Sequence, residues 1–238
     1  MPIIRSIIKK YFTKKQQPIE SRWAGKKVNF LGDSITSGTA KRNFVTYVTT
    51  VNQSLKLGTA RNYGISGGTI ASRDHLYPGE GLDDRLPPVV SRWQMMNTDA
   101  DIVFMLIGTN DYAAQIPIGD RDSTLISDFN GAFNIVLSGL KAKFPNAVIV
   151  VSTLLNRVPK PTRTHPLTID KYNNAILDRC KEHAITCFHL HEVTDLNLET
   201  DYMQGLFQLT ADGLHPGKEG SAILGRRIAE FINSNQKS

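Results

Sequence analysis

Serine, histidine and aspartate side chains that could together carry out acyl transfer occur in two short stretches far apart in the chain. Residues 32–34 read Gly-Asp-Ser and offer the hydroxyl of Ser34, whereas residues 212–215 offer the imidazole of His215 and, three residues before it, the carboxylate of Asp212. A serine hydroxyl becomes a useful nucleophile when a base accepts its proton and a third group orients that base. The two stretches therefore hold the parts of a nucleophilic serine site, provided that the fold brings them together.

Two further stretches supply the hydrogen-bond donors that such a reaction would use. Residues 62–68 read Asn-Tyr-Gly-Ile-Ser-Gly-Gly, and their glycines give a backbone whose amides can approach a substrate closely. Residues 108–111 read Gly-Thr-Asn-Asp and place the carboxamide of Asn110 directly after a strongly apolar run. Short motifs of this kind occur singly by chance, but the four together indicate acyl transfer.

In their order and separations, the four stretches resemble those of the SGNH, or GDSL-type, hydrolase family of esterases and lipases. The resemblance covers about residues 27–220, with Ile35 standing where the family name has leucine. It implies that Ser34 is the nucleophile, His215 the base and Asp212 the residue that orients the imidazole. It also implies an oxyanion hole formed by the backbone N–H groups of Ser34 and Gly67 and the side chain of Asn110, with no metal and no cofactor.

The resemblance implies a serine esterase that hydrolyses small-molecule carboxylic esters through an acyl-enzyme. We expect short acyl or O-acetyl esters, because the sequence contains no long apolar segment that could serve as a lid. The alternative is a non-catalytic or weakly catalytic envelope-associated binding protein, in which the pocket holds an acyl or glycan ligand. The complete set of serine, glycine, asparagine, aspartate and histidine argues against that alternative, because a pocket without activity has no chemical need for all five.

A second serine competes for the role of nucleophile. Residues 64–68 read Gly-Ile-Ser-Gly-Gly and match the nucleophile elbow of α/β-hydrolases, which would select Ser66. The elbow requires a strong strand before the serine and a helix directly after it. Here the preceding apolar run is short and residues 68–73 are a weak helix start, so the sequence favours Ser34 over Ser66.

Strand-like and helix-like segments alternate from residue 27 onward. We expect strands at 28–31, 60–63, 101–107, 147–152 and 186–190, and helices at 44–57, 82–96, 124–144, 168–184 and 218–233, with a long loop at 191–214. Such alternation predicts a mostly parallel sheet covered by helices on both faces. The sequence therefore predicts a three-layer α/β/α sandwich of flavodoxin-like order, with polar residues at the carboxyl ends of its strands.

Positive charge is concentrated at the amino terminus. Residues 1–27 contain eight Lys/Arg side chains and one acidic side chain, whereas the remaining 211 residues contain 20 basic and 21 acidic ones. The nearly neutral body argues against a general nucleic-acid-binding surface. Residues 1–26 are predicted to form a basic extension, amphipathic over residues 1–20, ahead of a hydrolase domain at 27–238. The extension could contact an anionic membrane surface, a second copy of the chain or the body itself.

Cysteine usage and the amino-terminal sequence suggest a reducing compartment. Cys180 and Cys187 form neither a disulfide framework nor a zinc pattern, so we expect two buried thiols. Arg5 and Ser6 interrupt the apolar residues that a signal peptide would need. The expected location is therefore the cytoplasm, with peripheral membrane contact through the basic extension as an option.

The remaining polar residues near these motifs receive structural interpretations. Asp33 and Asp111 are expected to brace turns by accepting hydrogen bonds from backbone amides. Arg157 is expected in a solvent-exposed loop, together with Lys160 and Arg163, and contact with an acidic or polar leaving group is the alternative for these three residues. Exposed loops are likewise predicted for His75 and His165, and no metal ligand set is predicted near His183, His189 and His191.

Overall fold

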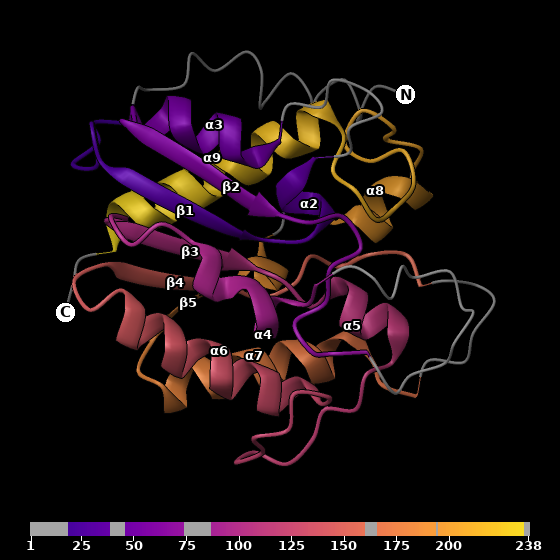
Figure 1. The fold of residues 1–238 in the computed structure, drawn as a ribbon. Helices are drawn as coiled ribbons and strands as arrows, with labels where there is room; N and C mark the ends of the chain where they lie inside the picture. The colour runs from indigo at the N-terminus through magenta and orange to yellow at the C-terminus, as the bar shows by residue number, and fades with distance from the viewer. Residues whose placement is uncertain (1–18, 39–45, 74–86, 160–165, 194, 236–238) are drawn as a thin grey trace.

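Five parallel strands form one sheet in the order β2-β1-β3-β4-β5 (Figure 1). The computed structural model describes residues 19–38, 46–73, 87–159, 166–193 and 195–235. The strands are β1 (Lys27–Gly32), β2 (Thr59–Gly64), β3 (Ile102–Leu106), β4 (Val148–Ser152) and β5 (Thr186–Phe188). This order confirms the predicted flavodoxin-like α/β architecture, and each predicted strand is found within a few residues of its expected position.

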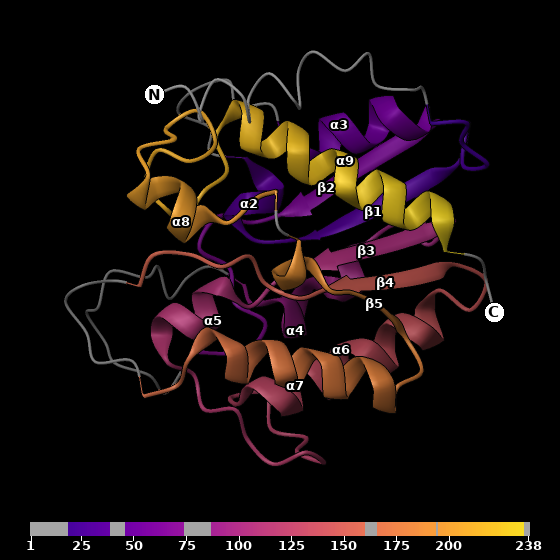
Figure 2. The same ribbon diagram turned by 180° about the vertical axis from the view of Figure 1, so that it is seen from behind.

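Helices cover both faces of the sheet. Helices α3 (Tyr47–Leu55) and α9 (Lys218–Ser234) pack side by side on one face, whereas α6 (Phe129–Lys143) and α7 (Ile169–Glu182) cover the other (Figures 1 and 2). Parallel strands require crossover connections, and helices are the usual way to make them. The result is the three-layer sandwich that the alternating sequence predicts.

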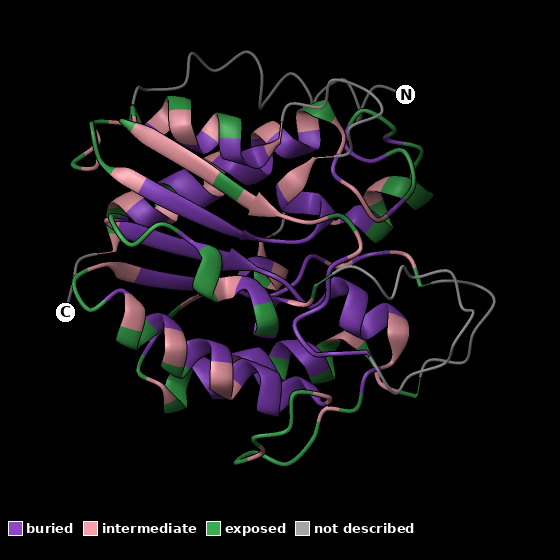
Figure 3. Ribbon diagram, viewed as in Figure 1, coloured by how far each residue is buried: buried purple, intermediate pink, exposed green. Residues whose placement is uncertain are grey.

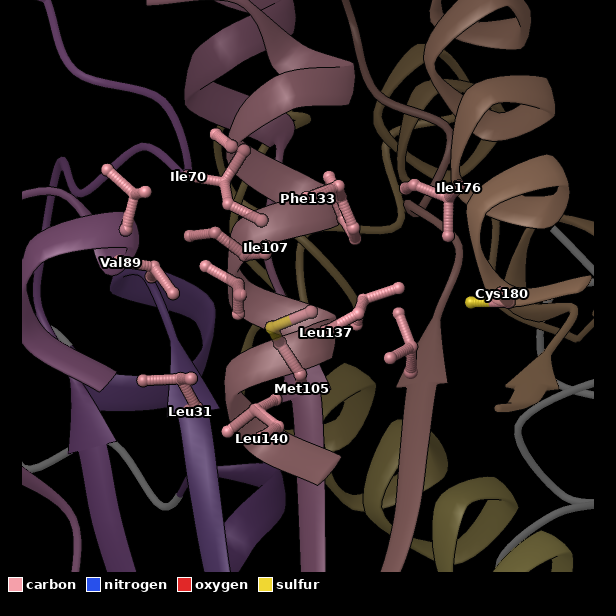
Figure 4. Close-up of a cluster of buried hydrophobic side chains, with 14 of the residues drawn as sticks. Leu31, Ile70, Val89, Met105, Ile107, Phe133, Leu137, Leu140, Ile176 and Cys180 are labelled. Atoms are coloured by element: carbon pink, nitrogen blue, oxygen red, sulfur yellow. The ribbon is translucent and has the colours of Figure 1, made fainter. Parts of the chain in front are cut away.

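The hydrophobic core is divided into two clusters by the sheet, whose central strands are buried on both faces (Figure 3). Side chains of β3 alternate between them, since successive residues of a strand point to opposite faces. Phe104 packs with the α3 and α9 face, and Met105 packs with the α6 and α7 face. Figure 4 shows Phe133 and Leu137 of α6 on the same side of the sheet as Met105, in the cluster that α6 and α7 cover. The continuous apolar runs of β1 and β3 follow from this two-sided burial.

Strands β1, β2 and β3 end at the same level of the sheet. Gly32 is the register partner of both Gly64 in β2 and Leu106 in β3. The segments that leave these three strands therefore enter the same edge, where ligands of open α/β sheets bind. Helices α2 (Ser34–Ser37) and α5 (Thr109–Ala114) begin there, and α8 (Leu198–Met203) lies at the same end (Figure 1).

Two predicted helices differ from the described structure. Helix α6 starts at Phe129 rather than near residue 124, because the Asp128 side chain accepts the amide of Gly131 at 2.7 Å and caps the helix there. Of the predicted helix 82–96, residues 82–86 lie outside the described structure. The rest is one turn, α4 (Val89–Arg92), followed by a 3-10 turn (Trp93–Met95), and Pro88 precedes it as the N-cap.

The predicted loop 191–214 contains a helix that the sequence analysis missed. Residues 198–203 form α8, with the side chain of Asn197 accepting the amide of Thr200 at 3.0 Å. A 3-10 turn (Leu190–Glu192) also precedes this segment. Each piece is too short to show a helical period in the sequence.

The predicted amino-terminal amphipathic helix falls almost entirely on residues 1–18, which lie outside the described residues. Trp23, which follows it, packs on the body and donates its indole N–H to the carbonyl oxygen of Ile232 at 3.1 Å. Within the described ranges, no helix combines the length and apolarity needed to cross a bilayer.

Candidate active site

Ser34 stands at the end of β1, at the first residue of the short helix α2. Asp33 is the N-cap of that helix, and its Oδ1 accepts the amide N–H of Ile35 at 2.9 Å. This bond confirms the predicted bracing role of Asp33. Thr36 Oγ1, in turn, lies 2.8 Å from the hydroxyl of Tyr47 in α3. The turn that carries Ser34 is therefore anchored at both ends by buried polar contacts.

Ser34, His215 and Asp212 form one hydrogen-bonded series. Ser34 Oγ lies 2.9 Å from His215 Nε2, and His215 Nδ1 lies 2.7 Å from Asp212 Oδ2. The other carboxylate oxygen, Oδ1, accepts the amides of Leu214 at 2.9 Å and His215 at 2.7 Å. Residues 181 positions apart in the chain thus meet with the spacing that proton transfer from serine to imidazole requires.

The His215 loop is held in shape by Thr210. Its hydroxyl donates to the carbonyl oxygen of His215 at 2.8 Å and accepts the amide of Gly213 at 3.0 Å. Partial burial acts to raise the pKa of Asp212, but the hydrogen bonds from His215 and Leu214 outweigh it and hold that pKa below its ordinary value. Asp212 is therefore a carboxylate at neutral pH.

The predicted oxyanion donors are the backbone N–H groups of Ser34 and Gly67 and the side-chain N–H of Asn110. The N–H groups of Ser34 and Gly67 have no acceptor among the backbone and side-chain contacts of the described residues. Gly67 has φ of 77°, a left-handed conformation that favours glycine, in the turn that follows β2. Asn110 lies in the first turn of α5 and donates one side-chain N–H to the carbonyl oxygen of Gly68 at 2.9 Å. That bond fixes the carboxamide and leaves its second N–H for another acceptor.

Asp111, next to Asn110, holds the same glycine-rich loop by its backbone. Its carboxylate accepts the amide of Ile70 at 3.0 and 3.1 Å and that of Ala71 at 3.1 Å. Asp111 is fully buried, and burial raises its pKa to about 7, although the amide hydrogen bonds act in the opposite direction. The predicted bracing role is thus confirmed, but the braced segment is the loop after β2 rather than the turn of Asp111 itself.

Asp33 is a second buried carboxyl beneath the site. Burial raises its pKa to about 6, against the lowering effects of the Ile35 amide and of positive charge on His215, Arg92 and Arg157. Arg92 was not identified from the sequence, and Arg157 was expected in a solvent-exposed loop. Their acceptors are mostly backbone carbonyl oxygens, which leave no side-chain motif in a sequence.

Arg157 corrects one expectation. The predicted solvent-exposed loop residue is only 5% exposed, and its guanidinium lies over the ring of Tyr112 with 5.8 Å between Cζ and the ring centroid. Its Nη1 is 3.4 Å from both the carbonyl oxygen and the hydroxyl of Thr109, the neighbour of Asn110. Burial lowers the pKa of Arg157. Lys160 and Arg163, predicted alongside it, lie outside the described residues.

Ser66 lies in a different setting from Ser34. It is exposed in the turn after the edge strand β2, and the described chain from Gly67 to Arg73 continues without a helix. The nucleophile elbow needs such a helix. The end of β2 also passes very close to α2, since a Cβ on Gly64 would meet the amide nitrogen of Ser37 at 2.2 Å.

The other histidines and the cysteines lie apart from these contacts. His183 Nε2 contacts Asn134 Oδ1 at 3.0 Å, and His191 Nδ1 contacts Thr153 Oγ1 at 2.9 Å. Cys180 is a buried thiol as predicted, whereas Cys187 is only partly buried. No cluster of three or more metal-ligand side chains occurs in the part of the chain that the structure describes. His75 and His165 fall outside it.

Comparison with known proteins adds a family and a set of related folds. Residues 30–223 match the GDSL-like lipase/acylhydrolase family. A structure from Lactobacillus plantarum has a TM-score of 0.74 at 23% identity, covering 90% of this chain and 99% of that one. A structure described as a possible lipase from Chitinophaga pinensis has a TM-score of 0.69 at 20% identity, covering 87% and 97%. No curated protein sequence matches this chain.

An acetylxylan esterase from Geobacillus stearothermophilus is also similar, with a TM-score of 0.56 at 21% identity and coverage of 89% of this chain and 96% of that one. At these identities the solved structures show a shared fold. The family match adds more, because it runs from β1 into α9 and includes all four motif stretches. The chain therefore belongs to the GDSL-like lipase/acylhydrolase family of hydrolases.

Proposed function

We propose that this hydrolase is a serine esterase in which Ser34 attacks a carboxylic ester. The observation that carries the proposal is the unbroken Ser34–His215–Asp212 series, with contacts of 2.9 and 2.7 Å. In addition, the backbone N–H groups of Ser34 and Gly67 lack acceptors among the described residues. Ser34 is buried, and a buried polar group normally has a partner. The unused N–H of Ser34, on the residue that carries the proposed nucleophile, is best explained by a substrate oxygen, and the Gly67 N–H is the proposed second donor.

In the acylation step, Ser34 Oγ forms a bond to the ester carbonyl carbon as its proton passes to His215 Nε2. The carbonyl oxygen becomes an oxyanion, and Asp212 stabilises the imidazolium through the bond to Nδ1. The imidazolium then gives its proton to the leaving alkoxide as the carbon–oxygen bond breaks. An alcohol departs and the acyl group remains on Ser34.

The oxyanion accepts hydrogen bonds from the Ser34 amide, the Gly67 amide and the free N–H of Asn110. These donors are fixed before charge develops, so they stabilise the transition state without reorganisation at the moment of reaction. In the second half of the cycle, His215 removes a proton from water, and the resulting hydroxide attacks the acyl-enzyme. The proton then returns to Ser34 Oγ, and a carboxylic acid leaves.

Short acyl or O-acetyl esters are the proposed substrates. One similar structure is that of an enzyme named for acetylxylan, an O-acetylated polysaccharide. The absence of a long apolar segment in the sequence also favours a small acyl group over a lipid chain. A panel of p-nitrophenyl esters from acetate to decanoate, together with acetylated sugars, tests this choice. We expect kcat/KM to fall as the acyl chain lengthens from acetate to decanoate.

The basic extension at residues 1–26 is proposed to act in association rather than in catalysis. It carries most of the excess positive charge, and none of the steps above uses it. An anionic lipid surface and a second copy of the chain are its two proposed partners.

The decisive experiment combines a fluorophosphonate probe with two matched variants. The wild type is expected to hydrolyse p-nitrophenyl acetate and to be labelled on Ser34, as identified by peptide mass spectrometry. Ser34→Ala should lose both labelling and turnover, whereas Ser66→Ala should keep both. A dead Ser66→Ala with an active Ser34→Ala would select the other serine, and an unlabelled, inactive wild type would favour the non-catalytic binding protein.

A further inference from the structure

Arg92 connects the two segments that supply the proposed nucleophile and the proposed Gly67 donor. It is the last residue of helix α4 and is 6% exposed. Its Nη2 donates to the carbonyl oxygen of Gly32 at 2.7 Å, and its Nη1 donates to that of Tyr63 at 2.6 Å. Gly32 lies two residues before Ser34, and Tyr63 lies four residues before Gly67.

A third donor completes the attachment. Arg92 Nε donates to the carbonyl oxygen of Pro87 at 3.1 Å, which fixes the guanidinium to the start of α4. The glycine-rich loop runs directly over this group, since a Cβ on Gly68 would lie 3.4 Å from Arg92 Nη2. One planar cation thus joins the ends of β1 and β2 and supports the loop above them.

Only arginine can make this set of contacts. Its guanidinium presents donors in a rigid fork, whereas the lysine ammonium is a single point on a flexible stem. Burial lowers the pKa of Arg92 to about 10, so the group remains a cation at neutral pH despite the cost of burying it. Its charge also favours the ionised form of the buried Asp33, which caps the Ser34 turn.

We propose that Arg92 is a positioning residue that fixes the Ser34 turn relative to the Gly67 loop. The inference rests on the esterase function proposed above, in which Ser34 Oγ and the Gly67 amide act on the same carbonyl group. Catalytic groups must be held to within about 0.5 Å of their productive geometry, and a misplacement of about 1 Å can lower a rate by about 10²-fold. Arg92 is hydrogen-bonded to both segments and therefore fixes their relative position.

Loss of the Arg92 hydrogen bonds is expected to lower kcat. A ground-state ester still enters the site, but the oxyanion no longer meets both donors in register with Ser34. Arg92→Lys keeps the positive charge but replaces the rigid planar fork with a single ammonium on a flexible stem, so it does not hold the two strand-end carbonyl oxygens in a fixed geometry. We expect its kcat to fall about tenfold or more with KM changed less than about twofold, the pattern of an interaction made in the transition state.

Arg179 provides a matched control. It is a buried arginine in α7, 2% exposed, that donates to the carbonyl oxygen of Arg121 and, at 3.2 Å, to Asn134 Oδ1. These contacts lie on the α6 and α7 side of the sheet and involve no segment of the proposed site. Arg179→Lys should therefore cost stability without changing kcat in the folded protein.

The experiment measures kcat and KM on p-nitrophenyl acetate, and the rate of Ser34 labelling, for full-length wild type, Arg92→Lys, Arg92→Ala and Arg179→Lys. Rates are referred to the folded fraction from near-ultraviolet circular dichroism. Guanidinium chloride at low millimolar concentration should partly restore turnover to Arg92→Ala, because the ion can occupy the vacated space, and should not stimulate Arg179→Lys.

The outcomes separate this inference from the proposed function. A wild type without esterase activity or Ser34 labelling refutes the function. An active wild type with Arg92→Lys retaining kcat within twofold, or raising KM at constant kcat, refutes the positioning role alone. An Arg92→Lys chain that does not fold, together with an Arg92→Ala chain that guanidinium does not rescue, would reduce Arg92 to a stabilising residue and also overturn the inference.

Discussion

The side chain of Asn110 is bonded to the carbonyl oxygen of Gly68, at 2.9 Å, so the two proposed donors Asn110 and Gly67 belong to one connected unit. Asp111 extends the connection by accepting the amides of Ile70 and Ala71. Asn110 and Asp111, at the start of α5, thereby hold the loop after β2. Asn110 donates one hydrogen bond to this loop, and Asp111 accepts hydrogen bonds from two of its amides. The oxyanion hole proposed here is thus a contact between α5 and this loop.

Asn110→Ala should lower kcat by about 10²–10³-fold, or about 2.7–4 kcal/mol, while KM changes little. The variant loses one donor to the oxyanion and also releases Gly68, so its effect belongs at the upper end of this range. Steady-state kinetics on p-nitrophenyl acetate measure it. A raised KM with an unchanged kcat would instead make Asn110 a ground-state binding residue.

Asp212→Asn should lower kcat by roughly 10²–10⁴-fold, because an amide can present the wrong hydrogen-bonding group to His215 Nδ1 and cannot stabilise the imidazolium. The Asp212 side chain is 51% exposed, so water can partly replace it, and we expect the smaller part of that range. Asparagine Oδ1 can still accept the amides of Leu214 and His215, which keeps the loop folded. Ser34 labelling should slow in parallel, and unchanged labelling would remove Asp212 from the proposed series.

Local sequence patterns predicted the sheet and the four stretches that meet at its edge. The apolar runs of β1 and β3 are long enough to identify buried strands, and the motif residues follow them directly. Parallel strands that end at one level bring the segments that carry Ser34, Gly67 and Asn110 to the same edge of the sheet. His215 could be placed only through the family resemblance, since its loop joins the site across 181 residues.

Contacts to backbone carbonyls explain most of what the sequence could not predict. Arg92 donates to the carbonyl oxygens of Gly32 and Tyr63, which are 60 and 29 residues away. Every residue has a backbone carbonyl oxygen, so the sequence does not identify which of them accept these hydrogen bonds. Arg157, predicted to be solvent-exposed, is buried because its guanidinium contacts Thr109 and lies over the ring of Tyr112, both in α5. Helix α8 was missed because its six residues depend on the Asn197 cap rather than on an apolar period.

Deletion of residues 1–18 should leave kcat/KM on a soluble ester nearly unchanged. The proposed mechanism draws only on residues from Ser34 onward, whereas the deleted segment carries a cluster of Lys/Arg side chains. If the extension binds lipid, full-length protein should sediment with anionic vesicles and be released by high salt, which screens the attraction. If it joins two copies, deletion should change the mass measured by light scattering. A folded deletion variant that loses esterase activity would contradict both roles.

Asp111→Asn should change how stability depends on pH. The ordinary pKa of an aspartate is 3.8, and burial raises that of Asp111 to about 7 in the folded protein. Between these values the unfolded chain releases the proton more readily than the folded one does. A raised folded-state pKa therefore gives wild type a stabilising contribution that is complete below about pH 4 and is lost as pH rises to about 7.

The measurement is the free energy of unfolding in urea for wild type and Asp111→Asn at pH 4.5, 6 and 8. Asparagine does not titrate, so the difference between the two proteins isolates Asp111 from Asp33, whose pKa of about 6 gives it an overlapping range. Wild type should lose stability relative to the variant between pH 4.5 and 8, whatever the absolute order of the two. A difference that stays constant over this range would mean that the backbone amides of Ile70 and Ala71 keep Asp111 ionised at every pH tested. In that case the clamp on the glycine-rich loop would not weaken as the solution is acidified.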